Sequence, residues 1–155
     1  MARRMERIFS GFPPYAYYRR WRNRRKNELK YREWTESGKP VPPPHIVKQL
    51  ALREYAERFG LGTLVETGTY RGEMVEAVRG IFDRIYSIEL DAALHKEAVR
   101  KFRRFRHIAI LQGDSGTVLK DVLPKLDRPT LFWLDGHYSG GETARLLFCR
   151  IMLQK

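Results

Sequence analysis

The sequence lacks the features that mark several large classes of protein. It contains one cysteine, Cys149, so an intrachain disulfide and a metal cluster built from cysteines are excluded. No run approaches the roughly 18 consecutive apolar residues that suggest a membrane-spanning helix. No apolar stretch follows Arg3 and Arg4, which argues against a secretory signal at the amino terminus. These absences lead us to expect a cytoplasmic protein.

Acidic residues are scarce in the first part of the chain. The 155 residues include 30 Lys or Arg and 18 Asp or Glu, for a formal net charge of +12. Residues 1–44 hold 12 of the basic residues and four of the acidic ones, so most of the surplus lies there. We therefore predict a basic, aromatic helical extension with a proline-rich linker over 1–44, a domain over 45–143 and a short tail over 144–155.

The extension has the pattern of a helix over residues 15–34. Tyr31 and Trp34 have the spacing that places two side chains on one helix face. The glycine and prolines within 38–44 end such a helix and form a stiff linker. Two interpretations stay open. The helix is a solvated element whose aromatic residues pack onto the domain, or residues 3–32 contact nucleic acid or another anionic surface.

The rest of the chain alternates between helical and strand patterns. The expected helices cover 45–59, 72–78, 92–104 and 115–123, and the expected strands cover 63–67, 84–90, 107–112 and 129–135. Near-continuous apolar strands separated by helices imply a parallel sheet that is buried on both faces. The sequence therefore predicts an α/β fold, with a Rossmann-like sheet of four parallel strands and flanking helices after the basic extension.

Polar or acidic groups follow every expected strand. In a parallel sheet with right-handed crossovers, the carboxyl ends of the strands lie at one edge. The groups at these ends are Glu66 to Gly72, Glu89 with Asp91, Asp114 with Ser115, and Asp135 with His137. Core packing alone does not require acids at four successive strand ends. We therefore expect these side chains to converge on one ligand site.

Each group also has a simpler explanation when it is taken alone. Gly68 and Gly72 suit an ordinary turn between strand and helix, or a backbone that lets a ligand approach closely. Glu89 follows the glycine-containing turn at the distance of the ribose-binding acid in nucleotide-binding sheets, but an exposed acid there would also cap a helix. Asp114 fits an adenine amino group or a helix cap, and Asp135 fits a turn.

Residues 62–143 resemble a class I S-adenosylmethionine-dependent methyltransferase. The first motif of that family is an acid followed at alternate positions by three glycines. Here it is Glu66-Thr67-Gly68-Thr69-Tyr70-Arg71-Gly72, with Tyr70 at the middle glycine. The resemblance implies S-adenosylmethionine as the cofactor, held by Glu66, Thr67, Gly68, Thr69, Gly72, Glu89, Asp114, Ser115 and Asp135.

The resemblance also implies a role for several of these residues. It puts Glu66 near the methionine amino group, Glu89 on the ribose hydroxyls and Asp114 with Ser115 at the adenine. Asp135 would lie near the methionine moiety and the substrate, as a catalytic or positioning acid. His137 is the best candidate for a general base, which is needed only when the acceptor is a hydroxyl or similar group. A single acid is weak support for a divalent cation, so we predict no metal.

The predicted function is therefore methyl transfer from S-adenosylmethionine to an unidentified small-molecule acceptor. The family fold has seven strands, and this sequence supplies four before residues 144–155. The resemblance thus implies a sheet that is truncated at the carboxyl-terminal side, with activity in doubt and an exposed sheet edge open to association. Two alternatives stay open: a non-enzymatic nucleic-acid-binding protein that uses its basic amino terminus, and a nucleotide-binding domain of another Rossmann type.

Overall fold

The computed structural model describes residues 13–134, and side chains from residue 22 onward. The chain divides into two compact units, and the division falls between Leu50 and Ala51. This point lies inside helix α3, His45–Phe59. No helix among the described residues is long and apolar enough to cross a membrane.

The first unit contains helix α2, Pro13–Glu36, which confirms the helix predicted over 15–34. The rings of Tyr31 and Trp34 lie 6.2 Å apart, as their spacing predicted. The helix ends in a Schellman motif, in which Gly38 has a φ of 84° and the Lys39 amide donates to the Trp34 carbonyl at 2.9 Å. This turn satisfies carbonyl groups that the last helical turn leaves without partners.

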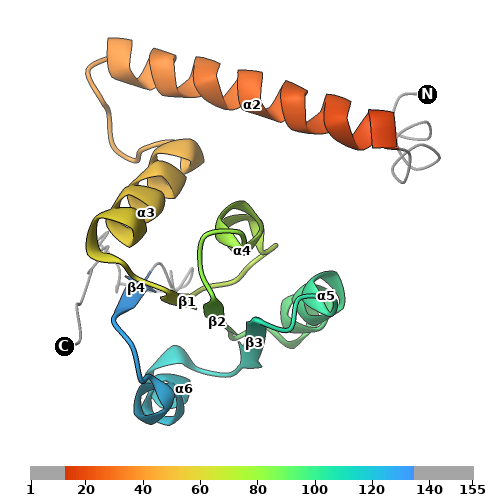
Figure 1. The fold of residues 1–155 in the computed structure, drawn as a ribbon, viewed down its shortest axis with the longest axis vertical. Coiled ribbons are helices and arrows are strands. Elements are labelled where there is room, and N and C mark those ends of the chain that lie inside the picture. The colour runs from red at the N-terminus through yellow and green to blue at the C-terminus, as the bar shows by residue number, and fades with distance from the viewer. Residues whose placement is uncertain (1–12, 135–155) are drawn as a thin grey trace. The chain divides into compact units, whose positions relative to one another are not determined.

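The second unit alternates strands and helices after the end of α3 (Figure 1). Its elements are β1 Thr63–Thr67, α4 Glu73–Val78, β2 Arg84–Glu89, α5 Ala92–Phe102, β3 Ile108–Gln112, α6 Ser115–Val122, the 3-10 turn η1 Leu123–Lys125 and β4 Thr130–Leu134. Within the described residues, the predicted boundaries are confirmed to within two positions. The alternating pattern of the sequence was therefore a sufficient guide to the order of the elements.

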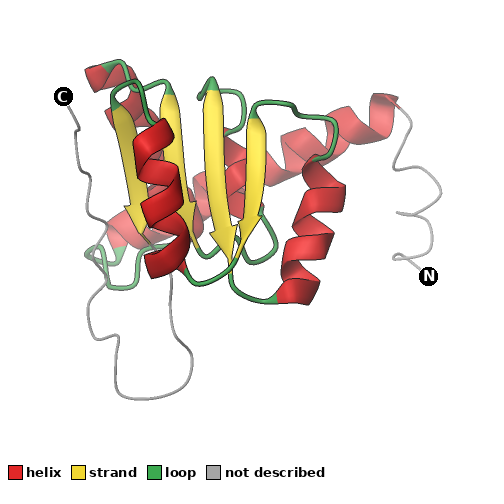
Figure 2. Cartoon of the chain, turned by 90° about the horizontal axis from the view of Figure 1, so that it is seen from below, coloured by secondary structure: helices red, strands yellow, loops and turns green. Residues whose placement is uncertain are grey.

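The four described strands form one parallel sheet in the order β3-β2-β1-β4. Figure 2 shows all four arrows pointing the same way. The chain builds from β1 through β2 to β3 in one direction and then adds β4 on the other side of β1. The sheet thus has a topological switch point between β1 and β4, and ligands of open α/β sheets bind beside such a point at the carboxyl ends of the strands.

Alternate residues of the strands face two separate cores. Leu64, Ile85 and Leu131 lie side by side in register and face the core formed with α4, α5 and the end of α3. Val65 and Phe132 face the other core, where α6 covers the sheet. Burying each such side chain contributes about 1.5–3 kcal/mol. These two cores hold the strands and so fix the positions of the loops at both edges of the sheet.

Candidate functional site

The loops that follow β1 and β3 are both hydrogen-bonded to the last residues of β2, at the carboxyl edge of the sheet. The amides of Gly68 and Thr69 donate to the Ile88 carbonyl at 2.9 and 3.2 Å. The Gly113 amide donates to the Glu89 carbonyl at 2.9 Å. These backbone bonds bring the carboxyl ends of the first three strands together, and we call this region the carboxyl-edge site. Convergence of the side chains on one ligand stays a prediction.

Asp135 and His137, which the sequence predicts as catalytic residues, lie outside the described residues. The predicted tail over 144–155 lies outside them as well. Thr67 is described, and it is the buried last residue of β1, in register with Ile88 and Leu134 of the neighbouring strands. Its position at the strand end matches the prediction, whereas its role in binding stays a prediction.

A buried chain of three polar side chains crosses from β1 to β2. Ser87 lies in register with Glu66, and its hydroxyl donates to Glu66 Oε2 at 2.5 Å. The hydroxyls of Thr69 and Ser87 lie 2.6 Å apart. Because the single hydroxyl proton of Ser87 is donated to Glu66, Thr69 is the donor to Ser87. A hydrogen bond from a hydroxyl to a carboxylate is strong. The bond from Ser87 therefore holds Glu66, which is only 2% exposed, in one orientation.

Sequence reasoning missed Ser87. It is fully buried at 0% exposure in β2, between Tyr86 and Ile88. The signal was a small polar residue two positions before Glu89, which puts both residues on the same face of β2. Only the strand register shows that Ser87 lies beside Glu66, so this signal is not enough to identify Ser87 from the sequence.

Glu89 joins the ends of β1 and β2. Its Oε2 accepts a hydrogen bond from the Tyr70 amide at 2.6 Å, and its Oε1 accepts one from the Asp91 amide at 3.0 Å. The side chain is 7% exposed. Each carboxylate oxygen has two lone pairs, so these two bonds leave acceptor capacity on both oxygens. The acid and the glycine-containing loop are therefore neighbours, as the spacing in the sequence suggested.

The loop over residues 68–72 takes left-handed backbone at alternate positions. Gly68, Tyr70 and Gly72 have φ values of 83°, 48° and 64°. These are the three positions at which the methyltransferase motif has glycines. Tyr70 therefore departs from the motif in its side chain and keeps the backbone conformation, at a cost of roughly 1–2 kcal/mol for a residue with a Cβ. Its ring is exposed and lies against the Arg71 guanidinium.

Gly72 has a packing reason to be glycine. A Cβ there would lie 2.6 Å from Phe102 Cε2, so the ring of Phe102 occupies the space that a side chain needs. Lys101 Nζ donates to the carbonyls of Arg71 and Gly72 at 2.9 and 3.0 Å. These contacts fasten the loop to the end of α5. They explain Gly72 without a ligand, and its place in a cofactor site stays a prediction.

Asp114 and Asp91 both cap helices. Asp114 Oδ1 accepts from the Thr117 amide at 3.1 Å at the start of α6, where Ser115 is the first helical residue. Asp91 Oδ1 accepts from the amides of Ala93 and Leu94, each at 2.8 Å. The helix-cap interpretation of Asp114 is thus observed. Contact with an adenine stays a prediction, and it would have to use the exposed part of the same carboxylate.

A cavity of about 290 Å³ lies at the opposite, amino edge of the sheet. Its lining includes Thr63, Arg84 and Tyr86 from the first halves of β1 and β2, and Lys125 and Arg128 from the segment before β4. It is therefore separate from the carboxyl-edge site. Within residues 22–134, no group of three or more His, Cys, Asp or Glu side chains is arranged to hold a metal ion.

The sequence matches no protein-family model and no curated protein. Solved structures resemble the chain in fold. The O-methyltransferase from Bacillus cereus in complex with SAH is 16% identical, with a TM-score of 0.50 over 70% of this chain and 53% of that one. The O-methyltransferase TomG from Streptomyces achromogenes, involved in tomaymycin synthesis and solved with SAM, is 19% identical, with a TM-score of 0.46 over 72% of this chain and 52% of that one.

The chain thus spans about half the length of these two structures. The likeness to the Bacillus cereus enzyme confirms the predicted fold class, a Rossmann-like parallel sheet of the kind found in class I methyltransferases. At such low identity it concerns the fold alone. Function has to be argued from the residues of the site.

Proposed function

We propose that the carboxyl-edge site binds S-adenosylmethionine and that the chain takes part in transfer of its methyl group to an acceptor. One observation carries the proposal. The carboxylate of Glu89, at the end of β2, is hydrogen-bonded to the Tyr70 amide in the loop after β1, beside the switch point of the sheet. An acid and a close-approach backbone loop side by side at this point are what a ribose-bearing ligand needs.

The chemistry of the donor set fits this cofactor. S-adenosylmethionine carries a sulfonium, an amino group, ribose hydroxyls and an adenine amino group, and carboxylates are acceptors or counter-charges for all of them. Glu89 keeps acceptor capacity on both oxygens beside its two amide bonds. Gly68 is exposed and has positive φ, so the backbone at the start of the loop is accessible. When bound, the cofactor would supply a methyl group on an electrophilic sulfonium.

The groups at successive strand ends would bind different parts of the cofactor. Glu66 and Thr67 at the end of β1, with Gly68, Thr69 and Gly72 in the loop after it, would hold the methionine end, because β1 borders the switch point. Glu89 would hold the ribose hydroxyls. Asp114 and Ser115, after β3, would contact the adenine. Asp135 would complete the methionine end of the site, and its role rests on its position after β4.

The acceptor is the least constrained part of the proposal. The two similar structures are O-methyltransferases by name, and on that analogy we propose a hydroxyl on a small molecule. A hydroxyl acceptor loses a proton during transfer, and His137 is the side chain proposed to take it. Positioning of the acceptor in line with the methyl group would supply most of the rate.

Calorimetric titration with S-adenosylhomocysteine tests the cofactor. A folded sample that releases no heat of binding would contradict the proposal. Glu89→Ala should weaken binding by about 1–3 kcal/mol, or roughly 5-fold to 150-fold, because hydrogen bonds to a charged partner are lost. Glu97→Ala is the matched control, since Glu97 is an exposed acid on α5. Equal affinities for the two variants would remove Glu89 from the site.

The alternatives drawn from the sequence are less well supported. A dinucleotide such as NAD is the ligand expected for another Rossmann type, and tighter binding of NAD than of S-adenosylhomocysteine would favour that class. Contact of residues 3–32 with nucleic acid also stays a prediction; within that range, Arg24, Lys26 and Arg32 are exposed on α2. The cytoplasmic location and association through a sheet edge stay predictions too.

A further inference from the structure

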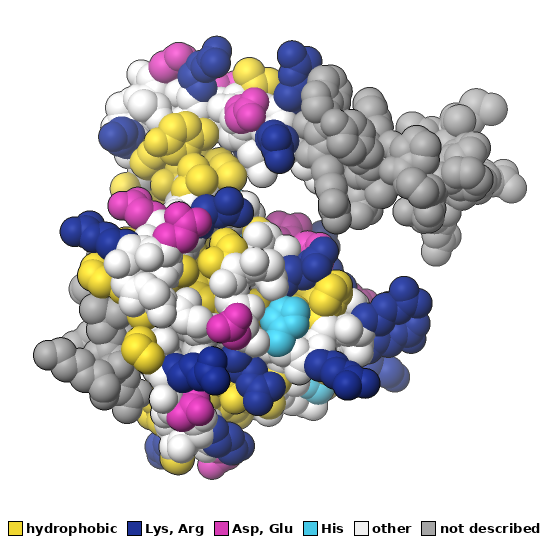
Figure 3. Space-filling view, viewed as in Figure 1, with side chains coloured by type: hydrophobic (Ala, Val, Ile, Leu, Met, Phe, Trp, Pro, Cys, Tyr) yellow, Lys and Arg dark blue, Asp and Glu magenta, His cyan; other side chains and the backbone are white. Residues whose placement is uncertain are grey.

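Positive charge gathers at the amino edge of the sheet, away from the carboxyl-edge site. The residues concerned lie at the start of β2 and in the loops that precede β2, β3 and β4. We call them the amino-edge surface: Arg79, Arg84, Arg103, Arg104, Arg106, Lys125 and Arg128. The same segments contain two acids, Asp83 and Asp127. Figure 3 shows dark blue side chains spread over this face of the second unit.

The charges of the turn before β3 are not neutralised. Arg103, Arg104 and Arg106 are exposed, and none forms an ion pair with a described residue. Within the described residues, the ion pairs of Arg128 are at 3.9 Å to Asp83 and 3.8 Å to Asp127, and its side chain is 61% exposed. Exposed pairs at such distances contribute little. Most of the positive charge of this surface is therefore available to a partner.

Phe105 anchors the backbone of the turn before β3 to the core. Phe105 is half-buried, its amide donates to the Phe102 carbonyl at 2.8 Å, and its ring lies 6.5 Å from that of Phe102. The Arg79 guanidinium lies 4.4 Å above the Phe105 ring. Because Phe105 points into the core, Arg104 and Arg106 on either side of it stay exposed. The fold thus presents these charges from an ordered turn.

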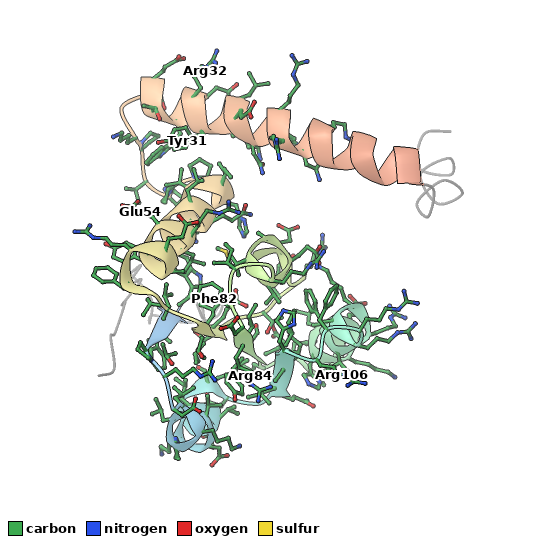
Figure 4. All side chains as sticks on the ribbon, in the orientation of Figure 1. Tyr31, Arg32, Glu54, Phe82, Arg84 and Arg106 are labelled. Carbon is green, nitrogen blue, oxygen red and sulfur yellow. The ribbon has the colours of Figure 1, made fainter. Side chains whose placement is uncertain are left out.

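Arg84 extends the surface from β3 toward β4. It starts β2, its guanidinium lies 5.7 Å from the Tyr86 ring, and both residues line the cavity of about 290 Å³. Lys125 and Arg128 line the same cavity. Figure 4 shows Arg84 and Arg106 on one face, near the starts of β2 and β3. Asp83 and Asp127 line this cavity as well, so two carboxylates lie among the basic residues that join β2 to the segment before β4.

We propose that the amino-edge surface binds the phosphate backbone of a nucleic acid. Six of its seven basic residues are Arg, whose planar guanidinium matches a phosphate with two parallel hydrogen bonds. A membrane fits less well, because surface-bound elements also insert apolar side chains. Among the described loops before β2, β3 and β4, the one large apolar side chain that is exposed is Leu123, at 39%. This proposal does not depend on the cofactor.

Fluorescence anisotropy of the full chain with a labelled single-stranded RNA of mixed sequence tests the surface. The variant is Arg103→Gln with Arg104→Gln and Arg106→Gln. A plot of log affinity against log salt concentration has a negative slope, and each lost phosphate contact makes it less steep by about 0.7. We therefore expect the steepness to decrease by about two and the affinity near 50 mM salt to decrease at least about tenfold.

A matched control removes the same charge elsewhere. Arg53→Gln with Lys96→Gln and Lys120→Gln takes three exposed basic residues from α3, α5 and α6, and it should keep most of the affinity. Equal losses in the two variants, or no RNA binding by the unchanged chain, would overturn the proposal. Binding to phosphatidylserine vesicles without RNA binding would overturn it in favour of a membrane.

The amino-terminal extension is intact in every variant, so its contribution is constant. Circular dichroism and thermal unfolding establish that the glutamine variant is folded. If it is not, the single changes Arg104→Gln and Arg106→Gln replace it, each with an expected slope change of about 0.7. Replacement of the same three arginines by Lys keeps the charge and should keep most of the salt dependence. Loss of that dependence in the folded Lys variant would contradict the phosphate assignment.

Discussion

The charged side chains at the two edges of the sheet differ in burial and in bonding. At the carboxyl edge, Glu66 and Glu89 are buried, and each is held by hydrogen bonds from a neighbouring strand or loop. At the amino edge, Arg103, Arg104 and Arg106 are exposed, and no ion pair within the described residues fixes them. A buried charge needs its partners built in, whereas an exposed charge is solvated by water. The acids of the carboxyl edge are thus held in place by the fold, and the amino edge is a charged surface.

This difference implies different responses to substitution. At the carboxyl edge, one change should disturb several linked groups, since Thr69, Ser87 and Glu66 form one chain of hydrogen bonds. At the amino edge, Arg103, Arg104 and Arg106 should each contribute separately and mainly to binding. The predictions that follow test this contrast through the free energy of unfolding.

Gly72→Ala should have the largest effect. The new Cβ would meet Phe102 at 2.6 Å, and the φ of 64° is unfavourable for any residue with a side chain. We expect a loss of about 3 kcal/mol in urea denaturation. Gly80→Ala is the control, because nothing lies within 4 Å of a Cβ at that position. A loss below that of the control would mean that the loop and α5 are not fastened together as described.

Ser87→Ala should come next. It removes the proton donor of Glu66 and the acceptor of Thr69, so buried polar atoms lose partners. We expect a loss of about 2 kcal/mol, measured by the same denaturation. Ser37→Ala on the first unit removes an exposed hydroxyl and should cost far less. If the two losses were alike, the buried chain would not be the organising feature of this edge.

Tyr70 separates the cost of the backbone from the cost of the side chain. Both Tyr70→Gly and Tyr70→Ala remove the exposed ring, but only glycine adopts a φ of 48° without steric strain. The glycine variant should therefore be more stable than the alanine variant by about 1 kcal/mol, as thermal unfolding would record. An alanine variant as stable as the glycine variant would argue against left-handed backbone at this position.

Arg104→Gln should have the smallest effect on stability. The side chain is exposed and forms no ion pair with a described residue, so the change should stay within about 0.5 kcal/mol. Thermal unfolding checks this, with Arg79→Gln as the comparison, because Arg79 is bonded to Glu76 at 3.1 Å and lies over Phe105. A large loss at Arg104 would erase the contrast between the edges.

The sequence contained enough to predict the order of the elements and the acids at the strand ends. The alternation of helical and strand patterns predicted the strands. Because parallel strands end at the same edge of a sheet, it also predicted that Glu89 lies near the loop after β1. The sequence did not contain the register of the strands, and without the register nothing relates Ser87 to Glu66 on the neighbouring strand. Nor did it reveal that Phe102, thirty positions further on, fills the space beside Gly72.

The amino-edge surface shows the same limit. In the sequence, Arg103 and Arg104 were the basic end of a predicted helix, which the helix dipole explains. Arg84 and Arg128 lay in separate segments with no apparent relation to them. Only the strand order puts the starts of β2, β3 and β4 at one edge. Surfaces assembled from several loops depend on topology, and for this reason local patterns do not predict them.

The strand order has one further consequence, for the way in which the second unit meets other molecules. Glu66, Glu89 and Asp114 lie at one end of the described strands, and the arginines of the amino-edge surface lie at the other, so these groups separate charge along the strand direction. If the amino-edge surface binds a polyanion as proposed, attraction to its arginines would favour encounters in which that edge arrives first. A polymer caught in this orientation would tether the unit and leave the opposite edge open. The second unit would then be able to bind a polymer at the amino edge and a ligand at the carboxyl-edge site at the same time.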